Sequence, residues 1–129
     1  MKPADSDLID AARAILRERA KPSVHFIGAA LRTRSGRVYC SVNLGTTVGR
    51  ASVCAEAVAL GMAAAAGETD VDCVVAVEEA GEVVSPCGIC REMLSDYSPD
   101  ANVIVPGTPT PRVTPVADLL PNKFVRAKR

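Results

Sequence analysis

The stretch from residue 73 to residue 105 constrains the fold more than any other part of the chain. It begins with the apolar run CVVAVE, passes a turn at residues 80–82 and a helical segment that ends near Tyr97, and finishes with the apolar run NVIV. A strand, a helix and a second strand in this order favour parallel pairing through a right-handed crossover. The chain is therefore predicted to be an α/β protein with a parallel strand pair at its centre.

Hydrophobic spacing predicts the other elements, and the 129 residues are expected to form one domain, residues 1–129. A strand near the C-terminal end is expected to return antiparallel, because the proline-rich segment before it leaves no room for a crossover helix. The predicted helices lie at residues 7–19, 54–66 and 86–97, and the predicted strands at residues 25–33, 38–43, 73–78, 102–105 and 112–116.

Two of the predicted helices carry recognisable start signals. Asp5, Ser6 or Asp7 suits the cap of the first helix, because a short polar side chain accepts a hydrogen bond from the first turn. Ser85 and Pro86 suit the cap and the first turn of the helix that ends near Tyr97.

Composition excludes several classes of protein. Lys plus Arg and Asp plus Glu both number 15, and only 3% of residues are aromatic, so a basic channel with stacking side chains is absent and no nucleic-acid partner is expected. The longest apolar run, residues 57–66, is shorter than the roughly 20 residues that span a bilayer, and no membrane partner is expected. The five cysteines are odd in number and clustered, unlike a disulfide framework. We expect a reduced, cytoplasmic protein.

Two short motifs place cysteines at the predicted starts of two helices. Cys54 and Glu56 lie in VCAEA, whereas Cys87 and Cys90 lie in SPCGIC. Helices that leave the same edge of a sheet bring their first turns together, and three thiolates there supply three ligands of a tetrahedral Zn²⁺ whose fourth position stays open. Glu56 is not needed as a ligand and can move a proton to a leaving amine. The motifs therefore predict one catalytic zinc site.

The cysteines also permit two hypotheses without a zinc site. A lone CxxC occurs in redox dithiols, and two apolar cysteines with a chance CAE upstream would need no metal. Cys40, Cys73 and His25 are poor candidates for a fourth ligand, because they lie in strands away from both motifs. Arg91, directly after the last ligand, either donates to a thiolate or is a surface arginine near a helix start.

The combination of CAE and PCGIC resembles the cytidine deaminase superfamily, and in particular its small tetrameric class, with details closest to the blasticidin-S deaminase branch. The resemblance implies three α/β/α layers around a five-stranded mixed sheet, and a homotetramer whose subunits complete one another's pockets. It implies one Zn²⁺ per subunit on Cys54, Cys87 and Cys90, with Glu56 as the proton shuttle. The implied reaction is the hydrolytic release of ammonia from a free cytidine-like nucleoside, from blasticidin S or from a related aminated heterocycle. Further segments with this resemblance are residues 27–31, 36–38, 42–43 and 119–124.

The resemblance also implies which residues contact the substrate, and it shows departures there. Cytidine deaminases carry N-x-E-N at the end of the second strand, where the Asn and Glu hold the ribose, but this chain has Gly45 in place of the Glu. His25 stands where the family places a Phe against the base. His25 could equally be a half-buried strand residue, and Phe124 could simply pack a terminal segment against the core. The implied substrate-binding residues are His25, Phe26, Asn43, Ala55, Ser85 and Phe124.

Four functions compete with deamination of a cytidine-like molecule. A nucleic-acid-editing deaminase is opposed by the neutral charge, and a redox protein would use Cys87 and Cys90 alone. A catalytically silent, zinc-stabilised subunit would have no use for Glu56. A deaminase of a non-pyrimidine heterocycle differs from the leading hypothesis only in its substrate.

Overall fold

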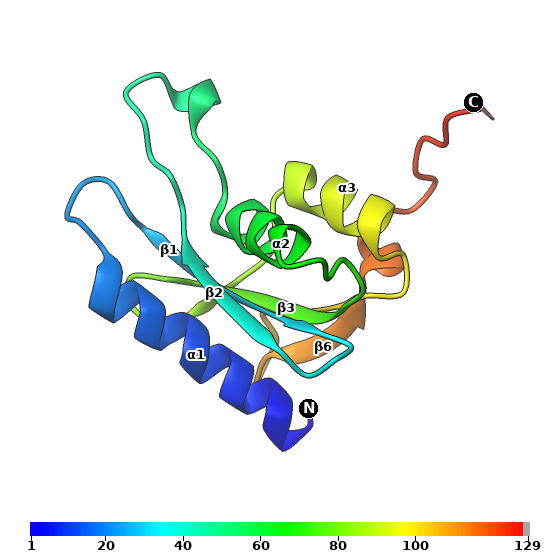
Figure 1. Cartoon of the computed structure of the whole chain (residues 1–129). Coiled ribbons are helices and arrows are strands. Elements are labelled where there is room, and N and C mark those ends of the chain that lie inside the picture. The colour runs from blue at the N-terminus through cyan, green and yellow to red at the C-terminus, as the bar shows by residue number, and fades with distance from the viewer. Residues whose placement is uncertain (128–129) are drawn as a thin grey trace.

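The structure of the chain, a computed structural model, describes residues 1–127 (Figure 1). All strands belong to one sheet with the order β2-β1-β3-β5-β6, and β4 pairs with β3. β3 and β5 are parallel and every other pair is antiparallel. The elements are α1 (Pro3–Arg19), β1 (Ile27–Thr33), β2 (Val38–Val42), η1 (Gly49–Ala51), α2 (Ala55–Ala65), β3 (Val71–Glu78), β4 (Val83–Val84), α3 (Gly88–Tyr97), β5 (Asn102–Val105), β6 (Arg112–Pro115) and η2 (Val116–Leu119).

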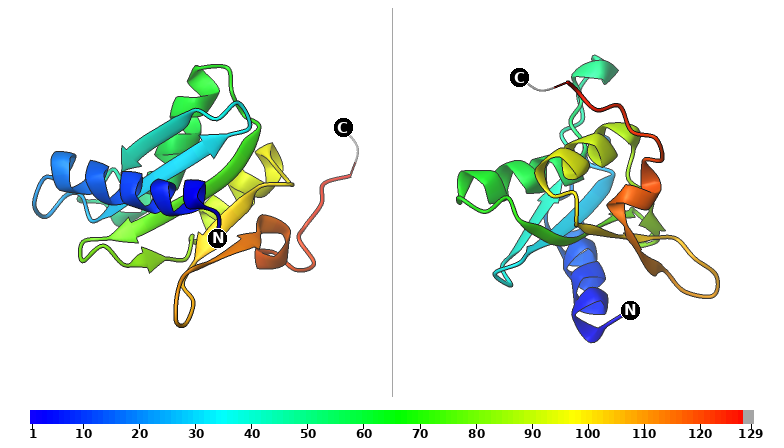
Figure 2. Two further views of the ribbon diagram at one scale, coloured as in Figure 1. Left: turned by 90° about the horizontal axis from the view of Figure 1, so that it is seen from below. Right: turned by 90° about the vertical axis from the view of Figure 1, so that its right-hand side faces the viewer.

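The predicted fold class is therefore confirmed: a five-stranded mixed sheet lies between helices, and the two-residue β4 is an addition. The strand that returns near the C-terminal end is antiparallel to β5, as expected. α1 covers one face of the sheet, and α2 and α3 cover the other (Figures 1 and 2). Alternate residues of a strand face opposite sides, so β1 places Ala30 in the α1-side core and Leu31 in the α2-side core. Burial on both faces explains the continuous apolar runs in β1 and β3.

The first helix begins four residues earlier than the sequence predicted. It starts at Pro3, and its cap is Lys2, so none of the three predicted cap residues holds that position. Proline suits a first helical turn because its fixed φ is already helical and its missing N–H has no partner there. Asp5 lies inside the first turn, where its carboxylate accepts a hydrogen bond from the Lys2 backbone N–H at 3.0 Å.

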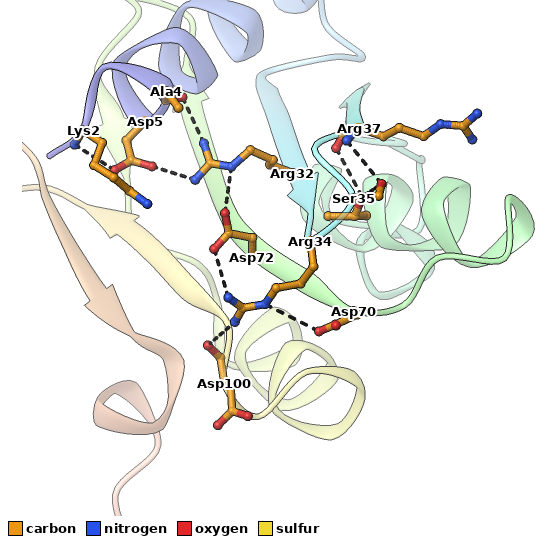
Figure 3. A network of polar contacts seen from close by, with 11 residues as sticks. Lys2, Ala4, Asp5, Arg32, Arg34, Ser35, Arg37, Asp70, Asp72 and Asp100 are labelled. Atoms are coloured by element: carbon orange, nitrogen blue, oxygen red, sulfur yellow. Dashed lines mark hydrogen bonds and ion pairs between the residues drawn. The ribbon is translucent and has the colours of Figure 1, made fainter.

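Asp5 also belongs to an ion-pair network that ties α1 to the sheet (Figure 3). The Arg32 guanidinium donates to Asp5 at 2.8 Å and to Asp72 of β3 at 2.9 Å. Arg34 continues the network to Asp72 and Asp70. Burial opposes ionisation of Asp5, but hydrogen bonds from Arg32 and Lys2 outweigh it and lower the pKa of that carboxyl.

The sheet end where β2 and β3 finish positions the candidate site. β1 is antiparallel to both strands, so its first residue, Ile27, lies at the same end as Val42 and Glu78. From this end the chain leads through the segment 43–53 into α2 and through β4 into α3. The segment 43–53 extends away from the body of the molecule as an arm (Figure 1). No helix within residues 1–127 is long and apolar enough to cross a membrane.

Candidate metal and active site

The three predicted cysteine ligands meet at this end of the sheet. The sulfur atoms of Cys54, Cys87 and Cys90 all lie within 4.8 Å of one another, and the Cys54 and Cys87 sulfurs are 3.3 Å apart. Cys54 is the N-cap of α2 and Cys87 is the N-cap of α3, so both motifs sit at helix starts as predicted. Ser85 and Pro86, predicted as the cap and first turn of α3, instead precede the helix, because the chain turns into it only after Cys87.

The pKa values of the three thiols are shifted in different directions. Burial raises the pKa of Cys54, and burial together with the charges of Glu56 and the other two thiols raises the pKa of Cys90. Burial also opposes ionisation of Cys87, but the backbone N–H groups of Cys90 and Ile89 and the neighbouring thiols outweigh it and lower the pKa of Cys87. Cys87 is therefore the thiol of the three that ionises most readily.

The geometry of the three thiols fits Zn²⁺. Zinc–sulfur bonds of about 2.3 Å in a tetrahedron separate the sulfurs by about 3.8 Å, and the observed spacings require only small side-chain rotations to reach that value. Cys73 is buried in β3, where burial raises its pKa to about 12, and Cys40 lies in β2. Within residues 1–127 no fourth His, Cys, Asp or Glu joins the cluster, which leaves one position of a tetrahedral metal for another ligand.

Glu56 stands in the first turn of α2, two residues after Cys54. Its side chain is buried, with 6% of the residue exposed, and makes no ion pair among the residues that the structure describes. Burial raises the pKa of the Glu56 carboxyl, partly offset by its own backbone N–H. A carboxyl with a raised pKa beside a metal site is suited to accept and return a proton near neutral pH.

Comparison with known proteins places the chain in a family. Residues 2–105 match the sequence profile described as the cytidine and deoxycytidylate deaminase zinc-binding region. The chain belongs to the cytidine and deoxycytidylate deaminase family. This confirms the family predicted from CAE and PCGIC. The zinc cofactor is confirmed as well, since the profile covers a zinc-binding region and the three thiols cluster within it.

Individual relatives in this family are deaminases with similar lengths. The chain is 36% identical to a blasticidin-S deaminase of Bacillus cereus over 130 aligned positions, covering 95% of this chain and 93% of that protein. It is 31% identical to a cytidine deaminase of Halalkalibacterium halodurans over 101 positions, covering 76% of each chain. Both relatives are named as deaminases, which is the class of enzyme that the cysteine motifs predicted.

Solved cytidine deaminases also share the fold. The structure from Burkholderia pseudomallei superposes with a TM-score of 0.79 at 32% identity, covering 96% of this chain and all of that chain. The structure from Mycobacterium leprae gives a TM-score of 0.80 at 28% identity, covering 95% of this chain and all of that chain.

Two of the residues that the family resemblance assigned to the substrate, His25 and Phe26, lie beside a cavity at the start of β1. His25 and Phe26 precede β1 instead of forming its start, because residues 21–25 make a turn in which the Val24 and His25 N–H groups both donate to the Lys21 carbonyl. His25 and Phe26 line a cavity of about 740 Å³. The other lining residues come from α1, this turn and the β3–β4 turn, and include Arg13, Arg17, Glu78, Glu79 and Glu82, but none of the three clustered cysteines and not Glu56.

The Asn43 side chain bonds to the backbone of residues 24–27, between this turn and the start of β1. Its side-chain Oδ1 accepts hydrogen bonds from the Phe26 N–H at 2.7 Å and the Ile27 N–H at 3.1 Å. Its Nδ2 donates to the Val24 carbonyl at 3.2 Å. The family resemblance assigned Asn43 to the substrate; these backbone contacts join segments 16 to 19 residues apart, and no residue pattern signalled them.

The remaining predicted residues are spread over the site and the tail. Ala55 is fully buried, and its carbonyl accepts the Ser41 hydroxyl at 2.5 Å, which fixes the first residue of α2 to β2. Ser85 is exposed just before the Cys87 motif. Phe124 is 80% exposed in the C-terminal segment.

Arg91 contacts backbone rather than sulfur. Its Nε donates to the Pro86 carbonyl at 2.8 Å and its Nη1 donates to the Leu119 carbonyl at 3.2 Å. No hydrogen bond joins Arg91 to a cysteine within the described part of the chain. The predicted contact with a thiolate is thus absent from residues 1–127 of this structure. The Arg91 guanidinium instead links the segment before α3 to the end of η2 through two backbone carbonyls.

Proposed function

We propose that the protein is a zinc-dependent hydrolytic deaminase of a free small molecule, either a cytidine-like nucleoside, blasticidin S or a related aminated heterocycle. The observation that carries this proposal is the convergence of three thiols at two helix starts with a buried carboxyl two residues from one of them. Membership of the deaminase family supports it. A silent, zinc-stabilised subunit is disfavoured, because burying the unpaired Glu56 carboxyl costs stability and would serve no purpose there.

Each residue of the site has a role in this proposal. Cys54, Cys87 and Cys90 would hold Zn²⁺, and their negative charge is partly offset by the N-terminal ends of α2 and α3. When bound, the metal would activate a water molecule for attack on the carbon that bears the amine. Glu56 would carry the two protons of that water in turn, the first to the ring nitrogen and the second to the leaving amine. The net reaction converts C–NH₂ and water into C=O and ammonia.

The substrate is proposed to be small and free in solution. The balanced charge and the small number of aromatic residues oppose a single-stranded nucleic acid, which needs a basic, stacking surface. The ligand thiols must also stay reduced, which fits a cytoplasmic location. The substrate contacts that the family resemblance implies remain part of the proposal, and Phe124 would reach the pocket of a neighbouring subunit. They are His25, Phe26, Asn43, Ala55, Ser85 and Phe124.

A homotetramer is proposed as the working form, and two exposed apolar surfaces support it. The first is the outer stripe of α3, formed by Ile89, Met93 and Tyr97 at intervals of four residues. The second is the arm 43–53, whose Leu44, Val48 and Val53 side chains are exposed. Exposed apolar patches of this kind mark surfaces where proteins associate.

The test is ammonia release by zinc-loaded protein from a panel of cytidine, deoxycytidine, cytosine, guanine, aminated pterins and blasticidin S. Zinc content is measured on the same preparation. We expect one equivalent of zinc per chain and turnover of at least one member of the panel. A fully zinc-loaded protein that releases ammonia from none of them would contradict the proposal.

A further inference from the structure

The three clustered thiols stay together only while the starts of two helices keep their places. Cys54 and Cys87 are the N-caps of α2 and α3, and their sulfur atoms are 3.3 Å apart. One torsion separates the backbone of a cysteine from its sulfur, so side-chain rotation makes up for very little backbone displacement. A functional group of side chains must be held to within about 0.5 Å of its working geometry. Contacts that fix these two helix starts therefore bear directly on the metal site.

Ser41 holds the start of α2 from the sheet. Its two neighbours in β2 pack in the α1-side core, so the Ser41 side chain faces α2. The residue is buried, with 5% exposed, and its hydroxyl donates to the Ala55 carbonyl at 2.5 Å. Ala55 stands between Cys54 and Glu56 in the chain. One hydrogen bond from β2 thus reaches the residue that joins a thiol of the cluster to the proposed proton shuttle.

The bond from Ser41 is not needed to form α2 itself. In an α-helix the carbonyl of each residue accepts the N–H four residues later, so the Ala55 carbonyl has a partner inside the helix. A carbonyl oxygen has two lone pairs, and the Ser41 hydroxyl uses the second. Because this second bond comes from another element, its effect is to fix where α2 starts relative to the sheet.

Arg91 holds the start of α3 in a corresponding way. Its Nε donates at 2.8 Å to the carbonyl of Pro86, the residue before Cys87. Its Nη1 donates at 3.2 Å to the Leu119 carbonyl at the end of η2. η2 is itself anchored, because the fully buried Val116 packs in the α2-side core. The guanidinium therefore links the entry to α3 to a fixed part of the fold.

We propose that Ser41 and Arg91 are positioning residues of the metal site, which set the separation of Cys54 and Cys87 without touching the metal. Each donates to a carbonyl next to one of these cysteines. Within residues 1–127 neither residue makes a hydrogen bond to a sulfur atom. The role of Arg91 is geometric and does not depend on donating to a thiolate. This inference rests on the zinc site of the proposed function and adds two residues to it.

Two substitutions of equal size test the hydroxyl of Ser41. Ser41→Thr and Ser41→Val add the same volume to the same buried place, and both residue types suit a strand, but only threonine keeps a hydroxyl. The zinc dissociation constant is measured by competition with a chelator. We expect it to rise about 10- to 100-fold in Ser41→Val and to change less than about threefold in Ser41→Thr, since outer contacts of a metal site contribute that much. Ser41→Ala, which adds no volume, should resemble Ser41→Val.

Arg91→Lys tests the second anchor while keeping its charge. A single ammonium lacks the fixed fork with which the guanidinium reaches two carbonyls. We expect the zinc dissociation constant to rise about 10- to 100-fold in this variant too. The matched control is Arg34→Lys, because the Arg34 guanidinium also donates to a backbone carbonyl, that of Asp100, at the opposite end of the sheet. Zinc binding should be unchanged in this control.

A general loss of stability is tested by Ser98→Ala. Ser98 is also a buried serine, and its hydroxyl donates to the Thr69 carbonyl at 2.6 Å and accepts the Val71 N–H at 2.8 Å. These bonds lie where β3 begins, at the end of the sheet away from the cysteines. Ser98→Ala should lower the Tm of the metal-free protein at least as much as Ser41→Ala does, and should leave the zinc dissociation constant unchanged.

Absorption spectra of the Co²⁺-loaded proteins supply a readout of the geometry at the metal. The thiolate-to-cobalt charge-transfer bands should shift in Ser41→Val and Arg91→Lys, because the thiols then sit at altered separations. The bands should keep their positions in Ser98→Ala and Arg34→Lys. Stability alone would not move these bands in a protein that remains folded.

The outcomes distinguish this inference from the proposed function, because metal binding is measured without turnover. An unchanged zinc dissociation constant in Ser41→Val and Ser41→Ala, or in Arg91→Lys, would overturn the role of that residue even in an active deaminase. Equal weakening by Ser98→Ala and Arg34→Lys would overturn the inference as a whole, since zinc binding would then follow stability. Weakened zinc binding in the Ser41 and Arg91 variants of a protein that deaminates nothing in the panel would support the inference and contradict the function.

Discussion

The sulfur atoms of Cys54 and Cys87 lie 3.3 Å apart although 33 residues separate them in the chain. They meet because each residue is the N-cap of a helix, and both helices start at the same end of the sheet. A helix N-terminus favours negative charge. The fold therefore brings the thiols together at two helix starts, whose partial positive charge offsets part of the cost that burial imposes on the ionised forms.

Replacing a ligand should remove zinc and stability together. Cys87→Ala deletes an exposed side chain, so its direct packing loss is small. Loss of the metal is the larger effect, since a ligand present at about 1,000 times its dissociation constant stabilises the folded state by about 4 kcal/mol. We expect zinc content near zero by elemental analysis and a lower free energy of unfolding. The matched control is Cys40→Ala, outside the cluster, which should keep its zinc; full zinc occupancy in Cys87→Ala would exclude it as a ligand.

Thiol labelling should depend on the metal. In the zinc-loaded protein Cys54, Cys87 and Cys90 should react slowly with an alkylating reagent. After chelation Cys87 should react first, because it is exposed and its pKa is lowered. Cys73, buried and with its pKa raised to about 12, should react only on unfolding. Mass mapping of labelled peptides checks this order, and rapid labelling of Cys87 before chelation would favour a redox dithiol instead.

The Asp5–Arg32 pair should make stability depend on pH at the acid end. The pKa of Asp5 is lowered in the folded state, so its stabilisation is present above the unfolded value of about 3.9 and is lost as pH falls through the folded pKa. Asp5→Asn should lower the free energy of unfolding at pH 7 by about 2 kcal/mol, the cost of losing a charged hydrogen bond while Asp72 still pairs with Arg32.

The difference between Asp5→Asn and the unchanged protein should shrink as pH falls below about 4, because the unfolded chain then binds a proton at Asp5, and it should vanish once pH is below the lowered folded pKa, where both states lack the charge. Both proteins lose zinc at the same low pH, because their thiolates become protonated. The difference between their free energies of unfolding therefore reports the Asp5 charge alone. The control is Asp10→Asn, whose exposed pair with Arg13 at 3.5 Å should contribute less than about 0.5 kcal/mol. A gap that stays constant down to about pH 2 in denaturant titrations would show that the Asp5 charge is not the cause.

The outer stripe of α3 should control assembly. Introducing Met93→Glu and Tyr97→Glu together places two charges on an apolar surface, and burying them in a subunit contact would be costly. Sedimentation velocity should show a tetramer for the unchanged protein and smaller species for this variant. Val38→Glu, which changes an exposed apolar residue at the β1–β2 turn, should leave the sedimentation coefficient unchanged. A tetramer that survives both α3 substitutions would place the contact elsewhere.

The sequence predicted those parts of the molecule that local chemistry determines. The run NVIV defined β5 without error, and Ser85 and Pro86 placed Cys87 and Cys90 at a helix start, although the helix begins only after Cys87. The early start of α1 was signalled by Pro3, a good first-turn residue, but the acidic cluster after it suggested a later cap.

Features created by long-range contacts were not predictable in this way. Arg91 follows a ligand in the chain, yet its partners are backbone carbonyls, one of them 28 residues away. Asn43 matched a substrate-binding pattern, and nothing in that pattern signalled the bonds that its side chain makes to the Phe26 and Ile27 N–H groups and the Val24 carbonyl. A local pattern of residue types does not show which distant segments will lie side by side. Hydrogen bonds between such segments are therefore seen only in the folded structure.

The proton-shuttle role of Glu56 is the decisive point of the proposed chemistry. Glu56→Gln keeps the size of the buried side chain and removes its ability to carry a proton, while the three thiols stay in place. Ammonia release and zinc content should be measured side by side for this variant and the unchanged protein, on the panel substrate that turns over fastest. We predict equal zinc and a rate reduced by at least about 100-fold, the usual contribution of a positioned acid–base group. Equal zinc with an undiminished rate would contradict the proposed mechanism.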